Sequence, residues 1–308
     1  MSIPLCFNFN WEAYPESAYP SIAREYLDHG IDTFVFVEPW ITKGLEQPEF
    51  IDFLRGFAQK MGIRFVSMHA AAGPKYDLNI PETDRRPGMI QDHLRSMAIA
   101  AEFGSKTYTV HVGAYHHCVK HIPVKDLRPN AIETLEKLVP EAERLGIVIA
   151  VENSFEPPNT PQEVIGLVNH FGGNPAIGVC YDTGHAHLMS PYPWKKRECY
   201  EPYMFKQWWQ NGIIEEAHAL DIVCQQVVTT HIHDNSGYGD LHSMPFDGTL
   251  DWDELMPKLF RNCPRMLEYQ TEINFQDGKG WAGESLAPVG GYSIKRQVEV
   301  FRKLGFSF

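Results

Sequence analysis

Residues 227–252 read VVTTHIHDNSGYGDLHSMPFDGTLDW, and the organisation of the chain can be worked out from this stretch. It opens with β-branched residues, which favour a β-strand, and a polar, Gly-containing turn follows. Side chains alternate along a strand, so His231 and His233 point the same way. Asp240 and His242 come just after the turn. The stretch predicts either a group of metal ligands at a strand end or a polar loop with ordinary hydrogen-bonded histidines.

Segments with strand and helix character alternate along the rest of the chain. Besides the strand that begins at Val227, strands are predicted at residues 5–11, 31–40, 63–69, 106–113, 147–153, 176–185 and 265–274. Helices are predicted at residues 17–29, 48–61, 88–103, 126–145, 161–171, 212–223, 252–260 and 285–304, and a glycine follows several of them.

This alternation favours an α/β fold in which eight strand–helix units close into a (β/α)8 TIM barrel. A doubly wound open sheet is the alternative. It usually has fewer units, and no G-x-G-x-x-G follows a predicted strand here. No linker-like or low-complexity segment interrupts the pattern. We therefore expect residues 1–308 to form a single barrel domain.

The composition narrows the function classes. A net charge of −12 disfavours binding to nucleic acid, which needs a basic surface, although bound cations could invert the field in a cleft. No stretch has the length and hydrophobicity of a membrane span, and residues 1–11 do not resemble a signal peptide. The six cysteines are scattered without a C-x-x-C pair, as is usual for reduced thiols. We expect a cytoplasmic protein that does not interact with membranes.

Most of the predicted strands end in a polar residue of a type that binds metals. In a TIM barrel these ends line one face, where active sites lie. The residues are Glu38, His69, His111, Glu152, Asp182, His231, His233 and Glu272; His185 follows one turn later, and Asp240 and His242 lie in a loop. Burying so many carboxylates and imidazoles is costly unless they are paired or hold a cation. We expect a divalent metal site, for Zn²⁺, Mn²⁺, Co²⁺, Ni²⁺, Fe²⁺ or Mg²⁺.

The motifs at these strand ends resemble those of the xylose-isomerase-like barrel superfamily, which includes sugar isomerases and epimerases and the endonuclease-four class of apurinic-site enzymes. In chain order they are VSMH, TVHVG, AVEN, YDTGHAH, HIHDNSGYGDLH, PFDGTLDW and TEIN, and they span strands three to eight. The resemblance is specific for the superfamily and less specific for a reaction.

For the sugar isomerases and epimerases, the resemblance implies one metal ion held by Glu152, Asp182, His231 and Glu272. It also implies that Glu152 and Glu272 act as acid and base on opposite faces of the sugar. Moving a proton next to a carbonyl needs a base near the carbon and a Lewis acid at the oxygens, so these residue types suit the reaction.

For the apurinic-site enzymes, the resemblance implies three zinc ions and nine ligands. The matching positions here are His69, His111, Glu152, Asp182, His185, His231, Asp240, His242 and Glu272, and all nine have the expected residue type. The number of ions therefore lies between one and three. His233 belongs to neither pattern, and it either supports His231, touches substrate or packs as a core histidine.

Further residues are candidates for binding a sugar or sugar-derivative substrate: His185, His233, Glu38, Trp40 and Trp194. Trp194 belongs to an aromatic insertion at residues 188–211, which is either a lid over the site or a contact in a homo-oligomer. The first hypothesis is a metal-dependent sugar isomerase or epimerase. The second is a multinuclear zinc phosphoesterase or related hydrolase, and the third is a non-catalytic sugar-binding barrel.

Overall fold

The computed structural model describes residues 3–277, 279–280 and 283–308. Eight parallel strands form the central sheet: β1 (Leu5–Cys6), β2 (Thr33–Phe36), β3 (Arg64–His69), β4 (Thr107–Val110), β5 (Val148–Glu152), β6 (Ile177–Asp182), β7 (Val227–Ile232) and β8 (Tyr269–Thr271). A small antiparallel hairpin, β9 (Lys279–Gly280) and β10 (Gly283–Glu284), lies outside this sheet.

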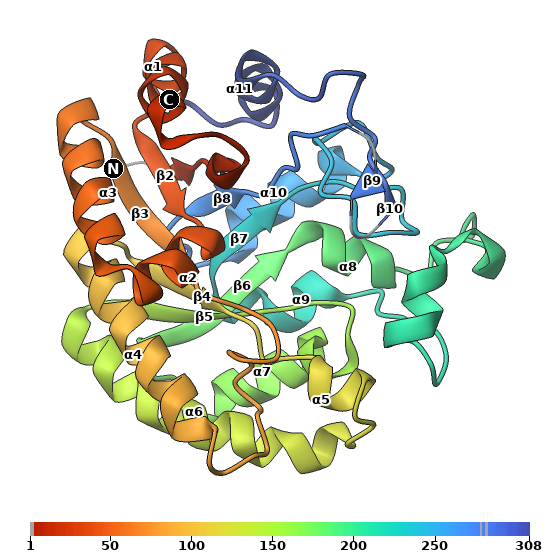
Figure 1. Cartoon of the computed structure of the whole chain (residues 1–308). Coiled ribbons are helices and arrows are strands. Elements are labelled where there is room, and N and C mark those ends of the chain that lie inside the picture. Colours follow the sequence, from red (N-terminus) through yellow and green to blue (C-terminus); the bar gives the residue numbers. More distant parts are fainter. Residues whose placement is uncertain (1–2, 278, 281–282) are drawn as a thin grey trace.

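The helices surround the sheet (Figure 1). They are α1 (Tyr19–Asp28), α2 (Glu38–Glu46), α3 (Pro48–Met61), α4 (Arg86–Phe103), α5 (Tyr115–Cys118), α6 (Val124–Leu145), α7 (Pro161–His170), α8 (Thr183–Met189), α9 (Ala219–Val223), α10 (Trp252–Asn262) and α11 (Ile294–Lys303). Among the helices that the structure describes, none has the length and hydrophobicity that crossing a membrane requires.

The sheet closes on itself through Phe7. The strands follow one another in the order β1-β8-β7-β6-β5-β4-β3-β2, which leaves β1 and β2 to meet. There the N–H of Phe7 donates to the Thr33 carbonyl at 3.0 Å, and the Phe7 carbonyl accepts from the N–H of Val35 at 3.1 Å. The prediction of a single-domain TIM barrel is confirmed.

Two predicted helices differ clearly from those observed. The last helix begins at Ile294 rather than at residue 285, after Pro288 and two left-handed glycines, and the Ser293 hydroxyl caps it by accepting from the Arg296 N–H at 3.2 Å. The helix predicted at 212–223 is limited to α9. Helices α2, α5 and α8 were not predicted; α8 follows β6 directly.

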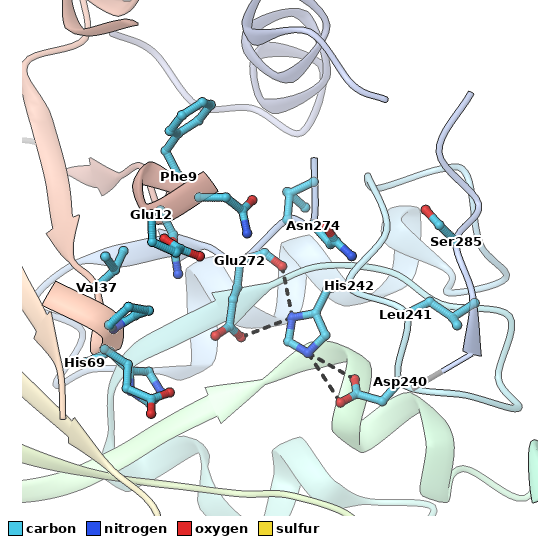
Figure 2. A pocket seen from close by; sticks show the side chains of 15 residues that line it. Phe9, Glu12, Val37, His69, Asp240, Leu241, His242, Glu272, Asn274 and Ser285 are labelled. Atoms are coloured by element: carbon cyan, nitrogen blue, oxygen red, sulfur yellow. Dashed lines mark hydrogen bonds and ion pairs between the residues drawn. The ribbon is translucent and has the colours of Figure 1, made fainter. Parts of the chain in front are cut away.

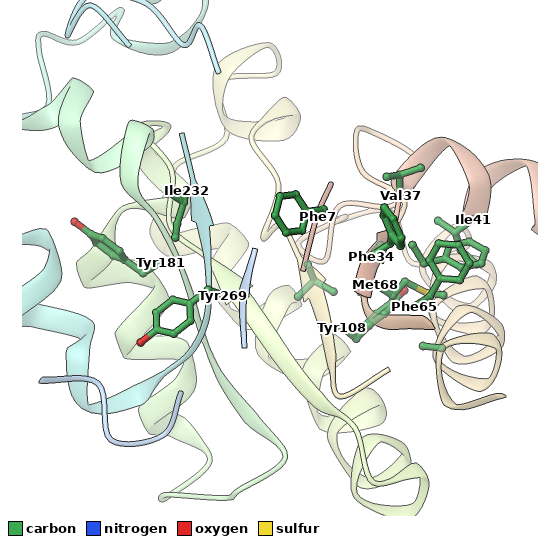
Figure 3. Close-up of a cluster of buried hydrophobic side chains, with 14 of the residues drawn as sticks. Phe7, Phe34, Val37, Ile41, Phe65, Met68, Tyr108, Tyr181, Ile232 and Tyr269 are labelled. Atoms are coloured by element: carbon green, nitrogen blue, oxygen red, sulfur yellow. The ribbon is translucent and has the colours of Figure 1, made fainter. Parts of the chain in front are cut away.

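The main hydrophobic core lies between the strands and the helices. Figure 3 shows part of it, including Phe34, Phe65 and Tyr108. A dense group of aromatic rings fills the side near α1–α3; there the rings of Trp11 and Trp40 have centroids 5.3 Å apart. Packing of this extent holds the strand ends in fixed positions.

The interior of the barrel, by contrast, is polar below the strand ends. Glu268, which is 1% exposed, accepts a hydrogen bond from the Thr107 hydroxyl on the far side of the ring and one from the Gln270 amide at 3.1 Å. The Thr107 hydroxyl also lies 3.1 Å from that of Ser67. Burial raises the pKa of the Glu268 carboxyl to about 7, more than its hydroxyl and amide donors lower it.

The raised pKa of Glu268 predicts a pH-dependent stability. The folded chain binds its proton more tightly than the unfolded chain, so stability should fall as pH rises from about 4.5 to about 7. Glu268→Gln, which cannot ionise, should avoid this loss and gain about 3 kcal/mol relative to the wild type between pH 5 and pH 8.5. Denaturant unfolding of both proteins at the two pH values measures how their free energies of unfolding change with pH. The same change in both proteins would contradict a raised pKa for Glu268.

Candidate metal centre

The barrel brings nine predicted ligands together at the carboxyl ends of its strands. Parallel strands place their ends on one face, and each ligand lies at or just beyond such an end, in the first turn of α8, or in the β7–α10 loop. Six of the nine are at most 7% exposed: His69, Glu152, Asp182, His185, His231 and Asp240. His111, His242 and Glu272 are partly buried.

The first group consists of His69, His111 and Glu152. His111 Nε2 lies 2.9 Å from Glu152 Oε2, and His69 Nε2 lies 3.5 Å from the same oxygen. Each residue offers one ligand atom, and all three atoms lie within 4.8 Å of one another. That spacing suits a single ion with nitrogen and oxygen ligands.

The central group contains Glu152 again, with Asp182, His231 and Glu272. His231 Nδ1 lies 3.2 Å from Glu152 Oε1, 3.1 Å from Glu272 Oε2 and 3.7 Å from Asp182 Oδ2. Glu152 therefore offers one carboxylate oxygen to the first group and the other to the central group, the geometry of a bridging ligand.

The third group joins His185 to Asp240 and His242, with His233 beside them. His185 Nε2 lies 3.4 Å from Asp240 Oδ2, and His242 Nε2 lies 3.2 Å from Asp240 Oδ1. The rings of His233 and His242 stack at 3.9 Å. The nine positions thus form three adjoining groups.

Buried polar atoms without hydrogen bonds support a cation at these groups. They are both ring nitrogens of His231, Asp240 Oδ1 and Glu272 Oε2. Some lie at ion-pair distance, but none has hydrogen-bond geometry. A buried polar atom without a partner is costly; a cation in the central group would satisfy Glu272 Oε2 and one ring nitrogen of His231, and a cation in the third group would satisfy Asp240 Oδ1. The donor set, imidazole with carboxylate, fits zinc and related ions.

The electrostatics are dominated by the carboxylates. Burial opposes ionisation of Glu152, but His231 and His111 hold the pKa of its carboxyl well below its usual range. Burial also disfavours the charged form of His242, yet Asp240 and Glu272 raise its pKa to about 9. Such a concentration of buried negative charge attracts cations.

Backbone carbonyls orient several of the ligands. His69 Nδ1 lies 2.8 Å from the Ala70 carbonyl, and His185 Nδ1 lies 3.0 Å from that of Asn153. The Asp182 carboxylate also caps α8, accepting from the His185 N–H at 2.6 Å. Fixing one ring nitrogen leaves the other free to bind metal.

His233 supports Asp182 rather than His231. Its Nε2 lies 3.1 and 3.0 Å from the two Asp182 oxygens, and the side chain is fully buried. The neighbouring Asp234 contacts no ligand histidine; it accepts hydrogen bonds from the Phe246 and Leu250 N–H groups and so holds the β7–α10 loop.

Gly184 provides the space for His233, which makes a testable prediction. A Cβ at Gly184 would lie 2.1 Å from the His233 ring, whereas one at Gly88, in α4, would meet nothing within 4 Å. Gly184→Ala should destabilise the protein by about 1–3 kcal/mol and lower its metal content, because the ring must move. Gly88→Ala, the matched control, should be neutral or stabilise by up to about 1 kcal/mol. Melting temperature and metal analysis compare the two; equal behaviour would contradict the role of Gly184.

The aromatic insertion packs on the loop that carries Asp240. Its side chains form a separate hydrophobic cluster with Phe155 and Tyr238. The Tyr203 hydroxyl accepts a hydrogen bond from the Asp240 N–H at 3.0 Å, and the Tyr238 carbonyl accepts one from Glu201. The insertion therefore stabilises the third group of ligands; its roles as lid or as oligomer contact stay predictions.

A cavity of about 310 Å³ opens above the ligands. Figure 2 shows His69, Asp240, His242 and Glu272 along one side of it. The remaining lining is made of Asn8, Phe9, Asn10, Glu12, Val37, Glu38, Pro39, Leu241, Ile273, Asn274 and Ser285. The described lining therefore contains amides and carboxylates but neither lysine nor arginine.

The predicted substrate contacts fall in different places. Glu38 lines the cavity and accepts a hydrogen bond from the Ala72 N–H at 3.2 Å. Trp40 is 2% exposed in the aromatic core and does not line this cavity, so its contact with substrate stays a prediction. His185 and His233 lie below the cavity lining, and Trp194 lies outside it at 42% exposure.

Comparison with known proteins agrees with this architecture. A family model described as a xylose isomerase-like TIM barrel matches residues 23–287. The chain belongs to that family. It is 32% identical over 100 residues to the uncharacterized protein y4fM of Sinorhizobium fredii, and 25% identical over 206 residues to the uncharacterized protein MJ1311 of Methanocaldococcus jannaschii. The matches cover 32% and 60% of this chain but only 23% and 61% of those relatives.

Several solved structures share the fold at low sequence identity. The apo form of 3-keto-D-glucoside 4-epimerase, YcjR, from E. coli aligns with a TM-score of 0.68 at 15% identity, over 99% of both chains. D-psicose 3-epimerase in the presence of D-fructose aligns with a TM-score of 0.68 at 15% sequence identity, and the alignment covers 98% of this chain and 96% of that one. The IOLI protein with a bound zinc atom aligns with a TM-score of 0.67 at 16% sequence identity, and the alignment covers 98% of this chain and 96% of that one.

Proposed function

We propose that the protein is a divalent-metal-dependent isomerase or epimerase that moves a proton next to the carbonyl of a sugar or sugar derivative. The observation that carries the proposal is the convergence of Glu152 and Glu272 on one atom, His231 Nδ1, at 3.2 and 3.1 Å, beside a cavity whose lining includes three asparagines. The solved epimerases of the same fold support the reaction class.

The two glutamates have distinct places in this proposal. Glu272 lines the cavity and takes the proton from the carbon next to the carbonyl: the C–H bond breaks, an O–H bond forms on Glu272, and the electron pair moves toward the carbonyl oxygen. Glu152, which lies deeper, has the return step in this proposal: its carboxyl enters the turnover protonated, its O–H bond breaks as a C–H bond forms on the other face, and proton exchange with water then resets both glutamates. A bound divalent cation supplies Lewis acidity at the substrate oxygens.

The cavity lining favours an uncharged substrate. Asn8, Asn10 and Asn274 offer amide donors and acceptors, which suit hydroxyl groups. Glu12 and Glu38 would repel a phosphate, and the described lining has no lysine or arginine to bind one. Sugars without phosphate are therefore the first compounds to test.

The test is isotope exchange in D₂O. The protein, loaded with Mn²⁺, Co²⁺ or Zn²⁺ in turn, is incubated with aldoses, ketoses, inososes and their phosphates. Mass spectrometry should detect one deuterium per turnover, at carbon, in at least one unphosphorylated sugar. Saturable sugar binding with no exchange would instead support the non-catalytic sugar-binding barrel.

A multinuclear zinc phosphoesterase is the second candidate. It is favoured by one observation: the third group, His185, Asp240 and His242, assembles as completely as the other two. Cleavage of bis(p-nitrophenyl) phosphate or of abasic DNA, lost in Asp240→Asn, would establish it. The acidic mouth of the cavity and the net charge of −12 argue against a DNA substrate.

A further inference from the structure

A second cavity adjoins the one above the metal ligands. Its volume is about 420 Å³, and it lies between the segment after β1 and helix α2. Its lining consists of Glu12, Tyr14, Pro15, Glu16, Tyr19, Pro39, Trp40, Lys43 and Phe50. Glu12 and Pro39 line both cavities, so the two meet along these residues. A ligand placed over the metal ligands can therefore continue into the second cavity.

An aromatic side chain forms part of the wall that connects the two cavities. The ring of Tyr14, which is 44% exposed, stacks on the ring of Phe9 with centroids 5.5 Å apart and an angle of 25°. Phe9 lines the first cavity and Tyr14 the second. The Tyr14 ring thus offers apolar surface next to the metal-side cavity. Trp40, 2% exposed, lies under the floor.

Polar groups accompany this aromatic surface. Lys43 pairs with Glu16 at 2.8 Å, and its ammonium lies 3.9 Å above the Phe50 ring. Because the charges of Lys43 and Glu16 compensate each other, this end of the cavity has no net charge. It still offers the ammonium of Lys43 as a hydrogen-bond donor and the carboxylate of Glu16 as an acceptor. Glu12 adds acceptors at the junction. Aromatic surface with hydroxyl-binding groups at the edge matches a sugar ring, which has apolar C–H faces and a polar rim.

We propose that the second cavity binds the further ring of a two-ring sugar, whose carbonyl-bearing ring occupies the metal-side cavity. This inference rests on the proposed function and names its substrate class: a reducing disaccharide or a keto-glycoside, in which the reacting ring keeps a carbonyl, rather than a free monosaccharide. A monosaccharide above the metal ligands would not use the second cavity, which Tyr14, Lys43 and Glu16 line.

The experiment compares ligands with and without a second ring. Calorimetry on metal-loaded protein measures Kd for methyl glycosides, p-nitrophenyl glycosides and disaccharides of glucose, galactose and mannose. For at least one sugar, the two-ring ligands should bind about tenfold more tightly than the methyl glycoside. Tyr14→Ala should remove most of that difference and leave the methyl glycoside within about twofold of its wild-type value.

Two further variants make the test specific. Tyr192→Ala is the matched control, because Tyr192 is also exposed and stacked, on Trp194 at 5.4 Å, but lines neither cavity. It should change no Kd. Lys43→Ala tests the same site if Tyr14→Ala fails to fold, and it should weaken disaccharides more than methyl glycosides. Equal affinity for one-ring and two-ring ligands, or equal weakening of both in Tyr14→Ala, would overturn the inference alone. Absence of all sugar binding would overturn the proposed function with it.

Discussion

Glu272→Gln should lower kcat by about three orders of magnitude, because a glutamine cannot accept the proton that Glu272 takes from the substrate. The fold should not change, since the side chain is partly exposed at the edge of the cavity. The central group should still hold its ion, because Glu152, Asp182 and His231 remain and the amide oxygen of glutamine can still bind metal. The loss should therefore appear in turnover more than in metal content.

The measurement is the initial rate on the sugar found by deuterium exchange, with metal content determined on the same sample. Glu299→Gln is the matched control, because it replaces a carboxylate by an amide in the same way but on the exposed face of α11. There Glu299 lies 3.9 Å from Lys295. An unchanged rate in Glu272→Gln would remove this residue from the chemistry.

Glu152→Gln should have a larger effect and a different signature. Its carboxylate contributes to both the first and the central group, and it is 1% exposed. An amide has only one oxygen and no charge, so it cannot bridge two cations as a carboxylate does. We expect activity below about one thousandth of the wild-type value and the loss of at least one ion per chain.

Asp240→Asn is the comparison for Glu152→Gln, because Asp240 belongs to the third group alone. It should reduce metal content by at most one ion and leave the central group occupied. Elemental analysis of both variants and of the wild type, after dialysis against metal-free buffer, gives the stoichiometries. Wild-type metal content in Glu152→Gln would contradict the bridging role.

The ligands could be predicted from the sequence because each lies at a strand end. Side chains alternate along β3 to β8, which places Ser67 with His69 and Thr229 with His231 on the inner face. Closure of the barrel then brings the strand ends together on one face. The same alternation could have identified the buried acid: Glu268, Gln270 and Glu272 are spaced by two along one strand. It could also have placed Asn8 and Asn10 in the cavity from the strand that begins at Leu5.

Trp40 was expected beside the metal ligands because the strand predicted at residues 31–40 extends beyond the observed β2. The chain turns into α2 at Glu38, and two residues along a helix rotate a side chain by about 200°. Glu38 therefore faces the cavity, while Trp40 turns into the aromatic core. The contacts of the insertion could not be predicted, because the hydrogen bond between Tyr203 and Asp240 joins residues from two loops whose shapes no periodicity sets.

The most direct test of the account is the metal content of the protein as purified, without chelator and without a nickel affinity step. Inductively coupled plasma mass spectrometry should find between one and three divalent ions per chain. Replacing His231, which lies within 3.7 Å of three carboxylates, by alanine should lower that number by at least one. A protein that purifies with less than about 0.1 ion per chain, and that binds neither zinc nor manganese when they are supplied, would contradict the central claim.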